Sequence, residues 1–194
     1  MRKATIKRKT KETNISATVV LNGNGESSIS TGIGFLDHML DLFAKHGMFD
    51  ITLTCKGDLH VDDHHTTEDV GIALANAFAS ALGEKKGIAR YGYAYVPMDE
   101  SLARCVVDLS GRSALVFKAE FNRKKVGDLS TEMIEHFFQS FADNSKANIH
   151  VEVIYGKNTH HKVEALFKAF ARAMRQACEL DPRVKGVLST KGKL

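Results

Sequence analysis

Apolar and polar residues alternate along several stretches of the chain, as they do in a β-strand with one buried face. Residues 13–21 show this clearly, because every second position is apolar at Ile15, Ala17, Val19 and Leu21. Similar patterns predict strands over residues 2–9, 13–21, 27–31, 49–55, 90–97, 101–110, 115–122 and 148–155. Longer runs with apolar residues three or four positions apart predict helices over residues 35–46, 66–82, 131–142 and 163–179.

The order of these predicted elements repeats along the chain. Three strands, a helix, a strand and a helix fill residues 1–88, and the same series fills residues 89–182 before a polar tail over 183–194. Because hairpin turns join many of the strands, we expect mostly antiparallel sheets, each with paired helices on one face. The sequence therefore predicts an α+β fold made of two similar halves and a C-terminal tail.

Composition narrows the class of protein. The chain has 194 residues, of which 43% are hydrophobic, and this is enough to bury a core. No apolar run approaches the ~20 residues of a membrane span, and the basic N-terminus lacks the apolar segment of a secretion signal. Three widely spaced cysteines argue against a disulfide framework and indicate the cytoplasm.

The charge pattern bears on the partners. The net charge is +4, but both signs are mixed along the chain. Aromatic residues do not alternate with basic ones as they do in a groove that binds single-stranded nucleic acid. We therefore expect a small anionic substrate, with no nucleic acid or membrane partner.

Two copies of a His-His-x-x-Glu motif stand out from this background. The first is His64-His65-Thr66-Thr67-Glu68, and the second, 96 residues later, is His160-His161-Lys162-Val163-Glu164. An acidic residue and a histidine precede each copy, at Asp37-His38 and, 98 residues later, at Glu135-His136. An internal duplication explains this arrangement better than chance.

The spacing within each motif is that of metal ligands. A helix turns about 100° per residue, so the glutamate lies one turn beyond the histidines, whereas adjacent histidines diverge too far to reach one ion easily. We therefore expect two ions, each bound by one histidine of each motif, by His38 or His136, and by Glu68 or Glu164. Nitrogen and oxygen ligands without thiolate suit manganese, iron(II), cobalt or zinc. The open coordination positions favour catalysis over a structural role.

Simpler roles compete with this interpretation. A single histidine at a helix start is usually a polar surface residue or a satisfied core group, but six of the nine histidines occupy duplicated positions. Asp62, Asp63 and Asp69 border the first motif. They either orient the imidazoles by hydrogen bonds, or Asp69 favours the helix N-terminus by its charge and the other two lie in a solvated turn.

Several longer segments resemble one known family. They are Gly32–Leu40, Asp62–Asp69, Pro97–Glu100, Asp108–Arg112, Glu135–Ser140 and His160–Phe170. In this order, and over nearly the whole chain, they resemble the imidazoleglycerol-phosphate dehydratases of histidine biosynthesis. The resemblance implies a fold of the ribosomal protein S5 domain 2-like type.

The resemblance also implies an activity. The family dehydrates D-erythro-imidazole-glycerol phosphate to imidazole-acetol phosphate, as a carbon–oxygen lyase. Metal on the ring nitrogens would stabilise an imidazolate, which expels the hydroxyl through a diazafulvene-like intermediate. Members bind two manganese(II) ions per active site, between subunits of a 24-subunit octahedral shell. The implied ligands are His38, His64, His65, Glu68, His136, His160, His161 and Glu164.

The remaining site residues are assigned within that reaction. Either Glu164 or Glu12 handles the proton on carbon, with Glu12 also at the substrate, and His46 moves a proton to the leaving hydroxyl. Alternatively, His46 is a charge at a helix C-terminus. The tail is expected to become ordered on substrate. The residues that match the family's phosphate-binding set are Arg90, Arg112, Ser189 and Lys191.

Two departures and two rival functions stay open. The tail has Thr190 where relatives usually have a second serine, which keeps a hydroxyl. Leu42 replaces a glutamine found in many relatives, and because leucine cannot donate a hydrogen bond, any substrate contact of that glutamine is lost here. A metal-activated hydrolase of a phosphorylated small molecule is the rival enzyme. A non-catalytic metal-binding shell is the rival from another class, but it has no use for the phosphate-binding cations.

Overall fold

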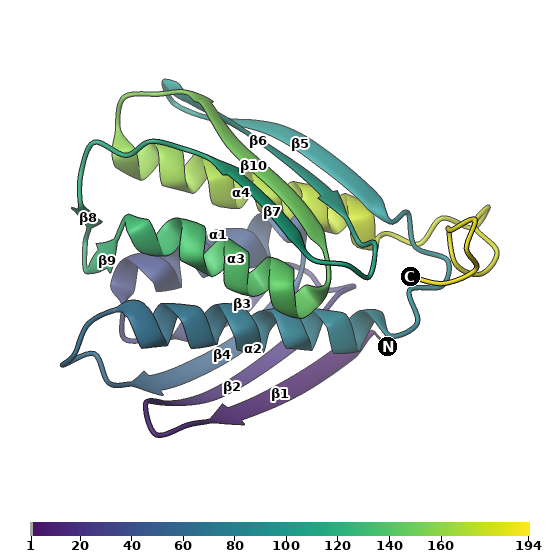
Figure 1. Ribbon diagram of the computed structural model, residues 1–194, viewed down its shortest axis with the longest axis horizontal. Coiled ribbons are helices and arrows are strands. Elements are labelled where there is room, and N and C mark those ends of the chain that lie inside the picture. The colour runs from purple at the N-terminus through teal and green to yellow at the C-terminus, as the bar shows by residue number, and fades with distance from the viewer. Residues whose placement is uncertain (1) are drawn as a thin grey trace.

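Two four-stranded sheets form the outer layers of the protein, and the helices lie between them (Figure 1). This computed structural model describes residues 2–194. The first half contains β1 (Lys3–Lys9), β2 (Thr13–Val20), β3 (Ser27–Ser30), α1 (Gly34–Gly47), β4 (Asp50–Gly57) and α2 (His64–Leu82). The second half contains β5 (Tyr91–Met98), β6 (Ser101–Asp108), β7 (Ala114–Lys118), β8 (Lys125–Val126), β9 (Leu129–Ser130), α3 (Glu132–Ser145), β10 (Asn148–Tyr155) and α4 (Thr159–Cys178).

The two sheets have the same topology, which confirms the two similar halves. The strand order is β1-β2-β4-β3 in one and β5-β6-β10-β7 in the other. Each sheet has two antiparallel pairs, as expected, but β3 pairs with β4, and β7 with β10, in parallel. Alternating burial along β2 turns Ile15, Ala17 and Val19 toward the helices, as the sequence pattern predicts.

Some element boundaries differ from the prediction. The helix α2 begins at His64 instead of residue 66, and α4 begins at Thr159 instead of residue 163. Asn158 caps α4, because its side chain accepts a hydrogen bond from the backbone N–H of His160 at 2.9 Å. The hairpin of β8 and β9 was missed because two residues per strand are too few to show alternation.

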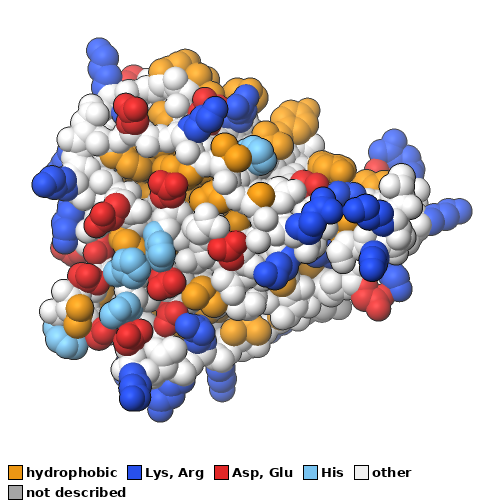
Figure 2. All heavy atoms as spheres, in the orientation of Figure 1, with side chains coloured by type: hydrophobic (Ala, Val, Ile, Leu, Met, Phe, Trp, Pro, Cys, Tyr) orange, Lys and Arg blue, Asp and Glu red, His pale blue; other side chains and the backbone are white. Residues whose placement is uncertain are grey.

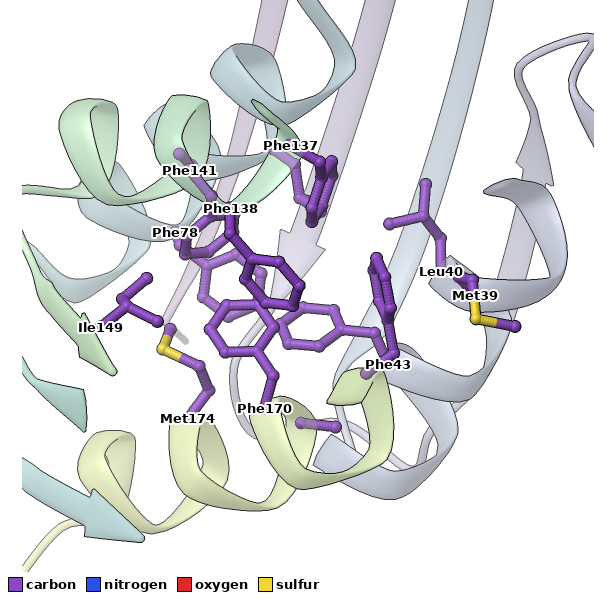
Figure 3. Packing of buried hydrophobic residues seen from close by; sticks show 14 of the residues in the cluster. Met39, Leu40, Phe43, Phe78, Phe137, Phe138, Phe141, Ile149, Phe170 and Met174 are labelled. Carbon is purple, nitrogen blue, oxygen red and sulfur yellow. The ribbon is translucent and has the colours of Figure 1, made fainter. Parts of the chain in front are cut away.

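A single hydrophobic core joins the two halves. The rings of Phe43 from α1, Phe78 from α2, Phe141 from α3 and Phe170 from α4 meet between the sheets (Figure 3). Phe43 and Phe170 stack with their centroids 4.8 Å apart. The boundary between residues 88 and 89 falls between α2 and β5 and stays a prediction. No helix among residues 2–194 is long and apolar enough to span a membrane.

Candidate metal centres and phosphate pocket

The first cluster lies between α1 and α4. His38 on α1 and His160 on α4 point their Nε2 atoms at Oε2 of Glu164, at 3.7 and 3.2 Å. The three side chains present ligand atoms within 4.8 Å of one another. Two imidazoles and a carboxylate at this spacing form a half-complete coordination shell for a divalent ion.

A lysine one turn further along α4 holds the carboxylate of this cluster. Lys168 Nζ lies 2.6 Å from Oε1 of Glu164, the oxygen that faces away from the histidines. Burial of Glu164 opposes its ionisation, but the bonds from Lys168 and His160 and the nearby His38 outweigh this and lower its pKa. The carboxylate is therefore ionised and oriented before any ion binds.

The second cluster lies between α2 and α3 and is built in the same way. His64 Nε2 and His136 Nε2 lie 3.8 and 3.6 Å from the two oxygens of Glu68. The imidazole centroids of the two histidines are 4.5 Å apart. His136 Nε2 is buried and has no hydrogen-bond partner within residues 2–194. A buried nitrogen without a partner is costly, and a metal ion would satisfy it.

The second histidine of each motif lies outside both clusters. The rings of His64 and His65 are 6.0 Å apart with planes at 77°, and those of His160 and His161 are 6.1 Å apart with planes at 84°. The expected divergence of adjacent histidines is therefore present. Each cluster takes a histidine from one motif only, so a single chain gathers three of the four ligands predicted per ion.

A carboxylate holds each of these outer histidines. Asp58 Oδ2 lies 3.0 Å from Nδ1 of His65, and Glu100 Oε2 lies 2.6 Å from Nδ1 of His161. These bonds raise the pKa of both imidazoles. Sequence reasoning missed both carboxylates, because Asp58 had only a turn signal and Glu100 was assigned to the turn between two strands.

The side chains of the three aspartates that could orient imidazoles bind other groups. Asp62 accepts a hydrogen bond from the backbone N–H of His64 at 2.8 Å, and Asp63 binds the backbone and hydroxyl of Ser130. Asp69 accepts bonds from Arg8 and Thr13 and so ties α2 to the first sheet. Within residues 2–194 none of the three side chains bonds an imidazole ring. Asp62 supports the motif by accepting from the backbone of His64, and the carbonyl of Asp63 accepts from the hydroxyl of Thr67.

Of the proposed acid–base residues, Glu12 and Glu164 contact histidines, whereas no histidine is among the charged neighbours of His46. Glu12, in the turn between β1 and β2, places Oε1 3.8 Å from Nε2 of His65. His46 is in the last turn of α1, and burial, followed by the charges of Lys168 and Arg172, lowers its pKa. This position is also the one that the alternative role, a charge at the helix C-terminus, requires, so both roles of His46 stay predictions. Leu42 packs partly buried against the core.

The four residues assigned to phosphate, Arg90, Arg112, Ser189 and Lys191, line a single hollow of about 490 Å³. Its other lining residues are Tyr91, Ser110, Leu188, Thr190, Lys193 and Leu194. Arg90 donates from Nε to Oδ1 of Asp108 at 2.7 Å. The Nη1 atom of Arg90 donates to the carbonyl of Leu188, also at 2.7 Å. The tail is thereby fastened beside Arg90. Cations gathered in one hollow suit a phosphate group.

The hollow and the clusters lie at opposite ends of the folded molecule. Arg90 donates its backbone N–H to Ala177 near the end of α4, whereas His160 is in the first turn of that helix. At a rise of 1.5 Å per residue, the two ends are ~26 Å apart. Figure 2 shows a group of histidines among acidic side chains at one end of the molecule and a group of Lys and Arg side chains toward the tail, with further basic side chains at other places on this face. One chain alone cannot bring metal and phosphate site to one small substrate.

Comparison with known proteins gives one family. The protein-family model described as imidazoleglycerol-phosphate dehydratase matches residues 31–174. The enzyme of that name from Chloroherpeton thalassium is 60% identical over 191 residues, covering 98% of this chain and 97% of its own. That from Leuconostoc mesenteroides is 57% identical over 193 residues, covering 100% and 99%.

Solved structures agree with this match. The crystal structure of the dehydratase from Staphylococcus aureus superposes with a TM-score of 0.84 at 40% identity, covering 92% of this chain and 99% of that one. That from Pyrococcus furiosus gives a TM-score of 0.83 at 34% identity, covering 97% and 100%. Similarity in sequence and fold extends over nearly the whole chain, so this protein belongs to the imidazoleglycerol-phosphate dehydratase family of enzymes.

Proposed function

We propose that this protein dehydrates D-erythro-imidazole-glycerol phosphate to imidazole-acetol phosphate in cytoplasmic histidine biosynthesis, with two manganese(II) ions per active site. The observation that carries the proposal is the combination of two matching His-His-Glu clusters with a cationic hollow. A metal store needs only the clusters. A phosphatase would release the phosphate, whereas a hollow that grips it suits a reaction in which phosphate stays on the product.

The clusters fit manganese by their ligand type and by their unmet bonding needs. Each offers two imidazole nitrogens and a carboxylate, a mixed set without thiolate that suits Mn(II). His136 Nε2 is the buried atom that a metal would satisfy. Bound manganese would supply Lewis acidity that stabilises negative charge on the imidazole ring of the substrate.

The chain's own residues have distinct tasks in this proposal. Glu164 is ionised and held by Lys168, which suits a ligand or a base near the reacting carbon. Glu12 is half-exposed beside His65, where it can accept a proton from substrate. His46 is neutral at neutral pH because its pKa is lowered, and a neutral imidazole can accept a proton and pass it to the leaving hydroxyl.

Neighbouring copies would complete each site. His65 and His161 lie outside the clusters of their own chain. The hollow lies ~26 Å from His160 along α4. If one copy presents His65, His161 and its hollow to the clusters of other copies, each cluster gains a fourth ligand and lies close to a hollow. A closed shell of 24 subunits with octahedral symmetry makes every such contact equivalent.

The test is turnover by protein stripped of metal and then given back manganese(II). Ketone product that appears only with metal supports the proposed reaction and cofactor together. Protein that rebinds manganese without forming ketone, at any substrate concentration, would instead support the non-catalytic shell. Release of inorganic phosphate in place of ketone would support the hydrolase.

A further inference from the structure

The outer histidines are held by carboxylates that come from different places in the two halves. The strands β4 and β10 begin 98 residues apart, so Gly156 is the counterpart of Asp58. The strands β1 and β5 begin 88 residues apart, so Glu12 is the counterpart of Glu100. The second half therefore lacks the carboxylate that binds Nδ1 in the first, and Glu100 takes its place at His161.

Both halves therefore place a carboxylate on Nδ1 of the histidine, although the carboxylates come from non-equivalent positions. This points to a need for that hydrogen bond at the site. We propose, on the basis of the proposed metal-dependent function, that Asp58 and Glu100 are positioning residues. Each fixes its histidine, His65 or His161, in the tautomer that has a proton on Nδ1 and a free lone pair on Nε2, ready to bind manganese.

The hydrogen bonds select this tautomer. An ionised carboxylate only accepts, so the ring nitrogen that faces it carries the hydrogen. In both cases that nitrogen is Nδ1, and Nε2 is left as the metal-binding atom. Nε2 of His65 lies 3.8 Å from Glu12, and Nε2 of His161 lies 3.7 Å from Asp99. Each lone pair therefore points into a negatively charged, partly exposed surface, which attracts a cation.

The two carboxylates differ in what else they hold. Oε1 of Glu100 accepts bonds from the backbone of Lys157 and Asn158 and from the hydroxyl of Ser101. Asp58 bonds His65 through Oδ2, while its Oδ1 is buried without a hydrogen-bond partner within residues 2–194. Loss of the Glu100 carboxylate also disturbs the start of α4, whereas loss of the Asp58 carboxylate acts on His65 alone. Asp58 thus gives the cleaner test.

The experiment measures transfer of manganese from the loaded protein to a chromophoric chelator. We expect Asp58→Ala to weaken the binding of one ion per chain by about 10- to 100-fold, as removal of an outer partner of a ligating histidine does elsewhere. Asp58→Asn should stay within a few-fold of wild type, because its amide oxygen still accepts from Nδ1–H. Glu100→Ala should weaken the binding of the other ion in the same way, but Glu100→Gln is no conservative control, because both oxygens of Glu100 accept hydrogen bonds and glutamine keeps only one acceptor.

Two controls separate positioning from general damage. Glu152→Ala removes a carboxylate that pairs with Arg104 on the second sheet, and it should leave both ions bound as in wild type. In a double-mutant cycle, Asp58→Ala should add nothing to His65→Ala, because it acts only through that ring.

The outcomes are distinct from those of the turnover test. Wild-type retention of both ions in Asp58→Ala and Glu100→Ala would overturn the positioning role, as would full additivity of Asp58→Ala with His65→Ala. If Glu100→Ala unfolds, the Asp58 series decides alone. Wild-type protein that binds two ions without forming ketone refutes the proposed reaction, yet leaves the positioning role to be judged by metal transfer.

Discussion

Glu164 divides its two carboxylate oxygens between the metal cluster and Lys168. Glu164→Gln removes the charge and turns an N–H group toward one of these partners. We expect metal binding at that cluster and turnover to fall together, metal affinity by more than about 100-fold, because this is a direct ligand and not an outer partner. Manganese content and ketone formation are the measurements. Glu179→Gln, just beyond the same helix, should change neither, and full activity in Glu164→Gln would refute the assignment.

Lys191 should affect substrate binding without affecting metal. It lines the hollow with Arg90 and Arg112, and a charge-assisted hydrogen bond contributes about 1.5–3 kcal/mol. We therefore expect Lys191→Ala to raise KM by roughly 10- to 100-fold while manganese content and assembly stay as in wild type. Lys185→Ala, an exposed tail lysine outside the hollow, is the matched control. Equal kinetics for the two variants would remove Lys191 from the substrate site.

The pH dependence of metal binding should show the raised pKa values of His65 and His161. The bonds to Asp58 and Glu100 raise both above the ordinary ~6.5. A protonated imidazole cannot bind metal, so affinity is full above the raised pKa and falls as the pH drops through it, by about tenfold per unit for each imidazole. In manganese competition assays from pH 8 to 5.5, the plot of the logarithm of affinity against pH should therefore begin to fall above pH ~6.5. Asp58→Asn should move one bend to lower pH, and an unchanged profile would contradict this.

Single residues were predictable where they repeat in the sequence. The duplicated motifs gave the cluster residues because His38 recurs as His136, 98 residues later, and His64 recurs as His160, 96 residues later. Asp58 and Glu100 could not be found in this way. Each reaches its histidine from a loop, and the position of a loop depends on how the sheets and helices pack.

Helix α4 and strand β5 pack so closely that one element leaves no room for a side chain on the other. A Cβ atom at Gly92 would lie 1.9 Å from the carbonyl oxygen of Ala173 and 2.8 Å from the backbone nitrogen of Ala177. These are backbone atoms that cannot move alone. We expect Gly92→Ala to lower the free energy of unfolding by about 3 kcal/mol or more, the upper end for overpacking.

Denaturant unfolding of Gly92→Ala beside Gly34→Ala measures this effect. A Cβ at Gly34, the first residue of α1, meets nothing within 4 Å, so that variant should unfold close to wild type. Equal midpoints for the two variants would contradict the close packing of β5 on α4.

Elements were predictable in kind and order, but not in their pairing. Periodicity identified the strands that became β2, β4 and β10, because buried positions alternate with more exposed ones along β2, β4 and the first four residues of β10. It could not show that β3 lies parallel to β4, since the pattern within a strand does not name its neighbour. The histidines also proved to lie inside their helices, because α2 and α4 start before their apolar runs.

At the scale of the whole molecule, one chain does not bring together all the residues of the proposed site. Each cluster has three of the four ligands expected per ion, His65 and His161 lie outside both clusters, and the hollow beside Arg90 lies ~26 Å from His160 along α4. Helix geometry predicted the number of ions but could not show which copy supplies each ligand. If metal joins the copies, chelation should convert one large particle into smaller species in mass photometry, and manganese should reverse this. An unchanged particle size after full metal removal would refute metal-bridged assembly.

Sharing of sites between copies can be tested by mixing two inactive variants. Glu164→Gln has a damaged cluster and an intact hollow, whereas Arg112→Ala has an intact cluster and a damaged hollow. Reassembled together from metal-free protein, they should form about a quarter of sites with both parts intact, when one copy supplies the cluster and another the hollow. Turnover should then rise well above that of either variant alone. A mixture no more active than its parts would refute sharing of the site between copies.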